Sequence, residues 1–428
     1  MIEAPYWLAT LSKFEVSSLK SEVQTLPPRA DVVVVGGGYT GLAAARRLAM
    51  RGASVLVLDR GDLGCGASSR SGGQVLTGLK LDAATLVAAH GERRARELFD
   101  VGRRAIADLE AIVGDEAIAC DYERAGHAQA AAKPSHFAAL RAEQTLLARV
   151  FGHRVELLSR EAQRSEIGTD AYHGLSIDEA SRAINPAKYV AGLAAAARRR
   201  GACLASNVEV TRLARDERRW RVATPKGEVV ADDLLVATNG YTGAVTPALR
   251  RGLVPIGSYV IVTEPLGEAQ AAALLPRRRV AFDTKHFLHY FRLTADNRLL
   301  FGGRAEFGRP TPDSTRRAAA TLRRGLSTIF PALAGAPIAG CWSGHVAFTR
   351  DQMPHAGRLD NLYFAGGYCG HGIAMATHLG DVVARRIAGD TDAHPLMDDR
   401  VPAIPLYDGR PWFLPVAGAY YKVLDWLT

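Results

Sequence analysis

A glycine-rich turn between a run of β-branched residues and a helical pattern constrains the fold of this chain more than any other feature. Val32 to Val35 form a short apolar run that is typical of a buried parallel strand. The turn Gly36-Gly37-Gly38-Tyr39-Thr40-Gly41 follows, and a helical pattern then runs over residues 42–49. Residues 54–58 predict a second strand, which ends at Asp59. This order predicts a βαβ unit, and therefore an α/β fold with a parallel sheet.

The glycines and the acid occupy the positions that dinucleotide binding requires. Gly36 permits the tight turn, Gly38 lets the backbone approach a pyrophosphate, and Gly41 lets the helix pack closely on the strand. The N-terminus of the helix faces the phosphates. Asp59, about 20 residues farther along, accepts hydrogen bonds from a ribose. The glycine motif alone also fits a tight turn that only packs, but together with the strands, the helix and the acid it favours a dinucleotide site.

Composition argues against several other classes of protein. The 428 residues are enough for two or three domains, and 48% hydrophobic with 23% charged residues is typical of a globular chain. The net charge of +9 comes from arginines in short clusters, so a solvated surface is favoured over nucleic-acid binding. The five cysteines are scattered and never form Cys-x-x-Cys, which argues against a disulfide framework, a dithiol reductase and a metal site.

Location also follows from the sequence as an expectation. No apolar run approaches the roughly 18 residues that a membrane helix needs, and the first residues lack a secretory signal. We therefore expect a cytoplasmic protein. The aromatic tail around Trp412 and Trp426 suits membrane docking, but packing of a C-terminal arm is favoured, so membrane binding is not expected.

Two further glycine-rich loops lie far from the first in sequence. Residues 64–75 follow the βαβ unit directly and are rich in small donors and exposed backbone amides. Residues 366–372 again lie between a buried strand, expected at 362–365, and the start of a helix, expected over 371–388. Loops of this kind at both ends of the chain suit a cofactor that is long and buried.

Four segments together resemble flavoproteins of the D-amino-acid oxidase and glycine oxidase superfamily: Gly36 to Gly41, Gly66 to Val75, Ala237 to Tyr241 and Gly367 to Gly372. Within that superfamily, residues 290–303 and 353–359 are similar to the γ-glutamylputrescine oxidase group. The resemblance covers nearly the whole chain. It implies FAD as the cofactor and oxidation of the carbon next to an amine nitrogen to an imine, which water hydrolyses to an aldehyde or keto product.

The resemblance also implies a domain organisation. We expect a Rossmann-like FAD-binding domain built from residues 31–115, 153–245 and 345–395, with a mostly antiparallel β substrate domain, residues 116–152 and 246–344, inserted between them. Strands within these ranges are expected at 208–210, 220–223, 234–237 and 338–348, with a hairpin around residues 295–297. Residues 1–30 and 396–428 are expected to form arms.

The expected FAD contacts lie mainly in the glycine-rich segments. They are Gly36, Gly38, Tyr39, Thr40, Gly41, Asp59, Arg60, Gly66, Ala67, Ser68, Ser69, Arg70, Gly73, Gln74, Val75, Val208, Thr238, Asn239, Gly240, Gly367, Tyr368, Gly370, His371, Gly372 and Ile373. Some sarcosine-oxidase-like relatives attach FAD through a cysteine. The corresponding place here is near Gly344, with Cys341 offset, so we expect non-covalent FAD.

Several residues are candidates for work on the substrate. His345, Tyr259, Tyr290 and Tyr368 could accept a proton or position the amine, and water is the alternative. His371 is expected to contact the cofactor, and the helix that follows it would stabilise negative charge there. Three further candidates lie on the sheet that covers the flavin in this superfamily: Arg292 and Arg304 to bind a substrate carboxylate, and Trp342 to wall an alkyl amine. The alternative for these three is a surface arginine and a core tryptophan.

The sequence does not decide the identity of the electron acceptor. The same sarcosine-oxidase-like relatives place a lysine on the hairpin strand over the flavin, which promotes reaction with oxygen, whereas this strand reads Arg298-Leu299-Leu300-Phe301. The substrate is expected to be a small amine or amino acid, and the acceptor is oxygen or another acceptor. The alternatives are a dehydrogenase of D-amino acids, proline or pipecolate that donates to a quinone, and a flavin-binding subunit without turnover.

Overall fold

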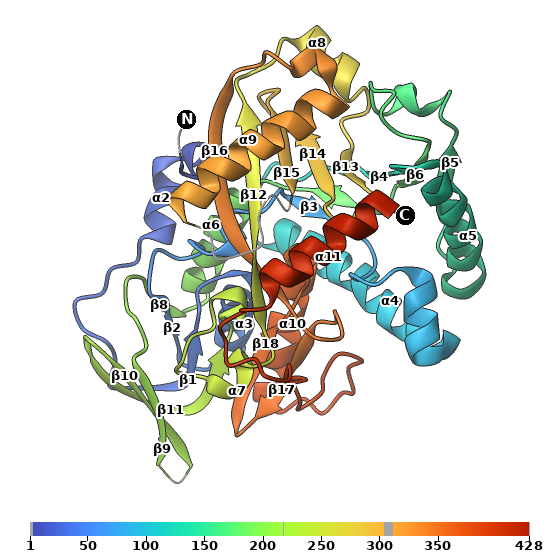
Figure 1. Ribbon diagram of the computed structural model, residues 1–428. Coiled ribbons are helices and arrows are strands. Elements are labelled where there is room, and N and C mark those ends of the chain that lie inside the picture. The colour runs from blue at the N-terminus through green and yellow to red at the C-terminus, as the bar shows by residue number, and fades with distance from the viewer. Residues whose placement is uncertain (1–2, 217, 304–310, 428) are drawn as a thin grey trace.

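A computed structural model describes residues 3–216, 218–303 and 311–427 of the chain. Within these ranges the strands form two eight-stranded sheets and one short two-stranded pair, β3 (Gln74–Val75) with β7 (Arg182–Ala183) (Figure 1). The chain passes from the first sheet to the second and back, so segments far apart in sequence build each of them.

The first sheet contains the predicted βαβ unit. Its central order is β17-β18-β11-β1-β2-β8, with β9 and β10 attached to β11 as an antiparallel extension. The pairs from β18 to β8 are parallel. The strands are β1 (Arg29–Val35), β2 (Val55–Leu58), β8 (Cys203–Ala205), β9 (Arg212–Asp216), β10 (Arg219–Thr224), β11 (Gly227–Val236), β17 (His355–Leu359) and β18 (Leu362–Gly366).

Both faces of this sheet are buried, as its β-branched runs predict. Val32 and Val34 pack in one hydrophobic cluster, while Val33 and Leu56 pack in another on the opposite face. Helix α4 (Ala83–Asp115) contributes to the first cluster, as do α3 (Tyr39–Met50), α6 (Pro186–Arg199) and α10 (Gly372–Ile387), and α3 contacts both α6 and α10. The N-termini of α3 and α10 therefore come from turns at the same edge of the sheet.

The second sheet is antiparallel except where β13 pairs with β4. Its order is β16-β12-β15-β14-β13-β4-β6-β5. The strands are β4 (His127–Ala130), β5 (Glu156–Leu158), β6 (Leu175–Asp178), β12 (Val254–Thr263), β13 (Val280–Asp283), β14 (His289–Leu293), β15 (Leu299–Gly303) and β16 (Ile338–Phe348). Helix α9 (Pro312–Ile329) packs on β12, β15 and β16, and α5 (Pro134–Phe151) packs on β5, β6 and α4 (Ala83–Asp115).

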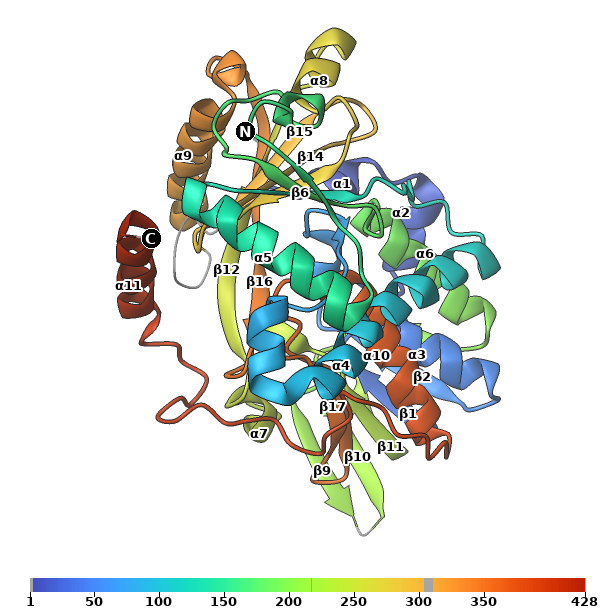
Figure 2. The ribbon, with the colours of Figure 1, turned by 90° about the vertical axis from the view of Figure 1, so that its right-hand side faces the viewer.

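Short helices complete the fold. They are α1 (Tyr6–Ala9) and α2 (Lys13–Leu19) in the N-terminal arm, α7 (Pro247–Arg250), α8 (Glu268–Leu274) and the C-terminal α11 (Leu414–Leu427). Figure 2 shows the chain after α10 running as an extended tail to α11. In the described residues no helix is long and apolar enough to cross a bilayer.

Three sequence-based expectations differ from this architecture. The stretch 153–178, expected in the FAD-binding domain, contains β5 and β6, which belong to the second sheet. β5 pairs with β6, and β6 pairs with β4, a more distant segment that local pattern does not identify as its partner. The boundary expected at 345 falls inside β16. Residues 208–210 are not a strand, since the Val208 N–H is bonded to the Asp59 carbonyl in a loop connection (2.7 Å) and no ladder continues from there.

Candidate active site

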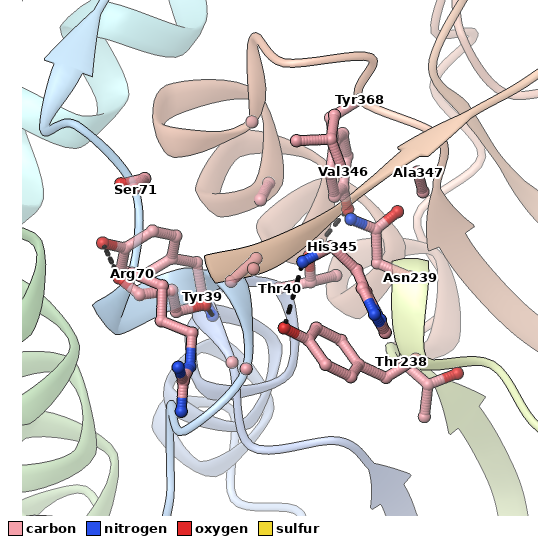
Figure 3. Close-up of a pocket in the computed structure, with 18 of the residues that line it drawn as sticks. Tyr39, Thr40, Arg70, Ser71, Thr238, Asn239, His345, Val346, Ala347 and Tyr368 are labelled. Atoms are coloured by element: carbon pink, nitrogen blue, oxygen red, sulfur yellow. Dashed lines mark hydrogen bonds between the residues drawn. The ribbon is translucent and has the colours of Figure 1, made fainter. Parts of the chain in front are cut away.

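A cavity of about 450 Å³ lies where the three glycine-rich loops meet the second sheet. This volume is in the usual range of small-molecule and cofactor sites. Its walls come from the turn after β1, the loop before β3, the segment after β11, strands β12, β14 and β16, and the start of α10. In Figure 3, Arg70 and Ser71 lie on one side of it and Thr238 and Asn239 on the other, with His345 between them.

The first glycine turn has the geometry that a close phosphate approach needs. Gly36 has a φ of 110°, and its N–H donates to the Leu58 carbonyl at 2.8 Å. A Cβ atom at Gly41 would lie 1.9 Å from the Gly36 carbonyl oxygen, so only glycine allows α3 to pack this closely on β1. The N-terminus of α3 therefore faces the cavity, where its amides and dipole favour an anion.

Asp59 lines the same end of the cavity. Its carboxylate accepts hydrogen bonds from the N–H groups of Gly37 (2.7 Å) and Gly61 (3.0 Å). Burial raises the pKa of Asp59, and these two amide donors oppose that shift. Nearby, the Arg60 guanidinium lies 5.7 Å from the centre of the Tyr241 ring. The fixed carboxylate can accept further hydrogen bonds, as a ribose would supply.

The second loop is held to β16 by Arg70. Its Nε donates to the Cys65 carbonyl (2.8 Å) and its Nη1 to the Ser343 carbonyl (3.1 Å), while its own carbonyl accepts from Trp342 Nε1 (2.8 Å). The guanidinium thus fixes the backbone that lines the cavity. The next residue, Ser71, also lines the cavity, and its buried Oγ has no hydrogen-bond partner within the described residues.

The third loop brings α10 to the cavity. The Tyr368 hydroxyl shares a 2.6 Å hydrogen bond with the Thr40 hydroxyl at the start of α3, which ties the two helix starts together. Burial and the nearby Lys80 lower the pKa of His371 to about 3, so its imidazole is neutral at neutral pH. Its Nδ1 atom is buried without a hydrogen-bond partner in the described part of the chain.

Tyr290 forms part of the cavity wall on the side of the second sheet. A Cβ atom at Gly302 would lie 2.2 Å from its ring and one at Gly72 would lie 2.8 Å from it, so the two glycines make room for the ring. Its hydroxyl lies 3.4 Å from the Ser258 hydroxyl. Burial raises the pKa of Tyr290 to about 12, so it is a neutral phenol. On β16, His345 stacks on Tyr241 with ring centres 4.8 Å apart.

Of the seven catalytic candidates, His345, Tyr290 and Tyr368 line the cavity. Tyr259 does not, because adjacent residues of a strand point to opposite faces, and its ring lies in the core with its hydroxyl 3.0 Å from that of Ser314. Trp342 is fully buried and anchors the Arg70 backbone instead of walling the cavity. Arg304 lies outside the described residues.

Arg292 has a different role from the expected carboxylate contact. It is buried, and its Nη1 donates to the carbonyls of Gly73 (3.1 Å) and Ile184 (2.9 Å), while its guanidinium lies 5.8 Å from the centre of the Trp7 ring. It therefore bonds backbone beside the second loop, outside the cavity.

Most of the expected cofactor contacts line the cavity. These are Gly36, Gly38, Tyr39, Thr40, Asp59, Arg60, Gly66, Ala67, Ser68, Arg70, Gln74, Val208, Thr238, Asn239, Tyr368, Gly370, His371, Gly372 and Ile373. Gly41, Ser69, Gly73, Val75, Gly240 and Gly367 do not line the cavity. Gly367 shows their structural use, since its φ is 76° and its N–H donates to the Asn239 side chain (2.9 Å).

The structure adds cavity residues that the sequence reasoning did not select as contacts. The main ones are Leu76, Lys80, Tyr241, Ser258, Val260, Phe282 and Leu288. Strand alternation could have indicated Ser258 and Val260, which share a face of β12. Leu76 and Lys80 carry no local motif, because the loop after β3 is brought to the cavity by long-range contacts.

The residues present fit a bound dinucleotide. Two helix N-termini and the Asp59 carboxylate face one cavity, which matches the needs of a pyrophosphate and a ribose. Ser71 Oγ and His371 Nδ1 offer buried polar atoms at its lining. In the described residues no group of three or more His, Cys, Asp or Glu side chains is placed to hold a metal ion.

Comparison with known proteins identifies the family. The family model described as FAD dependent oxidoreductase matches residues 31–386. The chain belongs to this family. It is 34% identical over 425 residues to γ-glutamylputrescine oxidoreductase of Escherichia coli (strain K12), covering 98% of this chain and 97% of that protein. It is 31% identical over 406 residues to the probable oxidoreductase OrdL of Haemophilus influenzae, covering 92% of each.

Solved structures agree on the fold. The crystal structure of glycine oxidase from Geobacillus kaustophilus superposes with a TM-score of 0.72 at 21% identity, covering 88% of this chain and 99% of that chain. L-proline dehydrogenase from P. horikoshii gives 0.69 at 21% identity, covering 92% and 99%. The predicted superfamily, fold class and FAD cofactor are confirmed, and the protein is an FAD-dependent oxidoreductase that acts on C–N groups of amines or amino acids.

Proposed function

We propose that the protein oxidises the C–N bond of an aliphatic primary amine of the γ-glutamylputrescine type to an imine, which water hydrolyses to an aldehyde and ammonia. The observation that carries the proposal is the 34% identity to the Escherichia coli γ-glutamylputrescine oxidoreductase across 98% of this chain. Because that similarity spans both sheets, it includes every segment that lines the cavity.

The chain's own residues would hold the cofactor at three places. The amides at the start of α3 and the Asp59 carboxylate would bind the pyrophosphate and ribose. The loop fixed by Arg70 would lie along the cofactor, and the N-terminus of α10 would stabilise negative charge. Bound FAD supplies the two-electron oxidation of the C–N bond.

The cavity suits a neutral amine with an alkyl chain. Leu76, Phe282 and Leu288 give it apolar walls for methylene groups. The Tyr290 and Tyr368 phenols are protonated at neutral pH, because burial raises the pKa of each. They can donate or accept a hydrogen bond, but they cannot take the ammonium proton as phenolates do. We infer that the amine reacts after losing its proton to water, while Tyr290 orients it; His345, which also lines the cavity, is the other candidate acceptor of that proton.

We also propose that FAD is bound without a covalent link. Cys341, the cysteine nearest the attachment point of covalent relatives, is fully buried outside the cavity, and its Sγ lies 3.6 Å from the Thr315 carbonyl. Cys65 and Cys369 do line the cavity. Burial raises the pKa of Cys65 to about 11 and also raises that of Cys369, which keeps both thiols protonated and weakly nucleophilic.

The test is product analysis with a panel of amines. Purified FAD-loaded protein is incubated in air with γ-glutamylputrescine, putrescine, sarcosine, D-alanine, L-pipecolate or L-proline, and aldehyde or keto product and hydrogen peroxide are measured. We expect γ-glutamylputrescine to give the highest kcat/KM of these six compounds. A higher value for an α-amino acid would contradict it. Product that forms only with an added quinone or dye would assign an acceptor other than oxygen.

A further inference from the structure

A buried polar network, here called the Asp178 network, lies directly behind one wall of the cavity. It consists of Asp178, Thr77, His153, His127 and Ser181. All but Thr77 are buried. They come from the loop after β3, from β4 and β6, and from segments next to β5 and β7. The network therefore joins the second sheet to the loop that continues from the second glycine segment.

Asp178 is the centre of this network. Its Oδ2 accepts hydrogen bonds from Thr77 Oγ1 (2.5 Å) and His153 Nε2 (2.8 Å), and its Oδ1 accepts from the Ala180 N–H (2.8 Å). Ser181 Oγ accepts from the Thr77 N–H (3.1 Å) and shares a 2.8 Å hydrogen bond with His127 Nδ1. Thr77 is thus bound through both its hydroxyl and its backbone amide.

The carboxylate remains ionised although it is buried. Contacts with His153, His127 and Thr77 outweigh burial and hold the pKa of Asp178 well below its usual range. A buried charge with this many partners favours one arrangement of the groups around it, because any displacement leaves a charge or a donor unsatisfied.

The groups held by the network carry part of the cavity wall. Leu76 and Lys80, on either side of Thr77 in one short loop, both line the cavity. Phe282 lines it as well, and its ring stacks on that of His127 with centres 5.2 Å apart. The hydrogen bonds to Thr77 hold the loop after β3, and the stacking on His127 holds Phe282 of β13. The network thus contacts two elements that line the cavity.

We propose that Asp178 is a positioning residue for the active site: through Thr77 and His127 it fixes the wall formed by Leu76, Lys80 and Phe282 against which the substrate binds. The measurement of KM in the test of this proposal rests on the proposed function, because it needs the amine substrate. The measurement of amide hydrogen exchange does not depend on the substrate, because it detects how firmly the wall is held.

The test uses Thr77→Val in the FAD-loaded enzyme, since valine has the shape of threonine and removes only the hydroxyl that Asp178 accepts from. The matched control is Thr145→Val, which removes an exposed hydroxyl on α5 that donates to the Arg141 carbonyl (3.2 Å). Thr77→Ser, which restores a hydroxyl, is the rescue variant. Amide hydrogen exchange of residues 76–80 and steady-state kinetics are measured for each.

The proposal expects Thr77→Val to raise KM about tenfold with kcat within about twofold, and to speed exchange at residues 76–80 at least about tenfold. Thr145→Val should match the parent, and Thr77→Ser should recover most of both effects. Unchanged exchange in Thr77→Val would overturn the proposal. Faster exchange or a lower Tm with an unchanged KM would also overturn it, because Thr77 would then stabilise the fold without positioning the substrate. If the parent enzyme oxidises a panel amine other than γ-glutamylputrescine, the proposed function fails and the KM for that amine decides this inference. If it oxidises none of them, unchanged exchange in Thr77→Val still overturns this inference.

Discussion

Replacing Gly41 with alanine introduces a methyl group into the contact between α3 and β1. The added Cβ would lie 1.9 Å from the Gly36 carbonyl oxygen and 3.1 Å from Val34 Cγ1. The first of these atoms is backbone in the turn itself, so α3 must move away from β1 and take the turn with it. The substitution acts on the part of the structure that presents amides to the pyrophosphate.

The magnitude follows from overpacking. Inserting a methyl group into a packed contact costs typically about 1–3 kcal/mol, and the backbone clash puts this site at the upper end, while alanine in a helix returns about 0.5–1 kcal/mol. The net cost is about 2 kcal/mol in stability. The free protein relieves this strain by moving α3, and FAD binding must restore the close contact, so the FAD Kd rises by up to roughly 30-fold, since about 1.4 kcal/mol corresponds to a factor of ten.

The assay is titration of deflavinated protein with FAD, followed by quenching of flavin fluorescence. Gly114→Ala is the matched control, because it changes a helical glycine in α4 around which a Cβ atom meets nothing within 4 Å. We expect Gly114→Ala to keep the FAD Kd within about twofold. An unchanged Kd in Gly41→Ala with a normal Tm would refute the argument that this close approach builds the site.

Three further predictions test the site. Asp59→Asn should raise the FAD Kd about tenfold or more, because an amide is a weaker acceptor than a carboxylate for ribose hydroxyls; a Kd within twofold of the parent would contradict this role. Since burial lowers the pKa of His371 to about 3 and raises that of Tyr290 to about 12, neither group titrates between pH 5 and 10, and kcat/KM should rise with pH as the substrate amine loses its proton; an ionisation near neutral pH that His371→Gln or His345→Gln removes would disagree. Acid precipitation should release all of the flavin into the supernatant, and yellow colour retained in the pellet would mean a covalent link.

Elements of the fold that have a clear local sequence pattern could be predicted from the sequence. The turn from Gly36 to Gly41 follows a β-branched run and precedes a helical one, so strand, turn, helix and Asp59 could be predicted together. The helix at α10 and the strand β16 likewise have local patterns and lie where they were expected. The two strands within 153–178 were missed as part of the second sheet, because their pairing with β4 and with each other is set by contacts between distant segments.

The site residues divide in the same way. The glycine-rich loops line the cavity because their backbone forms those walls in conformations that favour glycine. Glycines in the sequence could therefore indicate these loops. Tyr259 was wrongly expected there, although alternation along β12 puts it on the face opposite to Ser258 and Val260. Arg292 shares a face with Tyr290, but it lies beneath the Gly73 loop, a position that only the tertiary packing reveals.

The central claim is that this cavity binds FAD and oxidises an amine of the γ-glutamylputrescine type. The most direct measurement is the visible spectrum of the FAD-loaded protein, recorded anaerobically while γ-glutamylputrescine is added. We expect flavin absorbance that is lost with one equivalent of this amine and much more slowly with putrescine or D-alanine. A spectrum that γ-glutamylputrescine leaves unchanged while another amine bleaches it would rule out this substrate, and a protein that binds no FAD would rule out the assigned cofactor site.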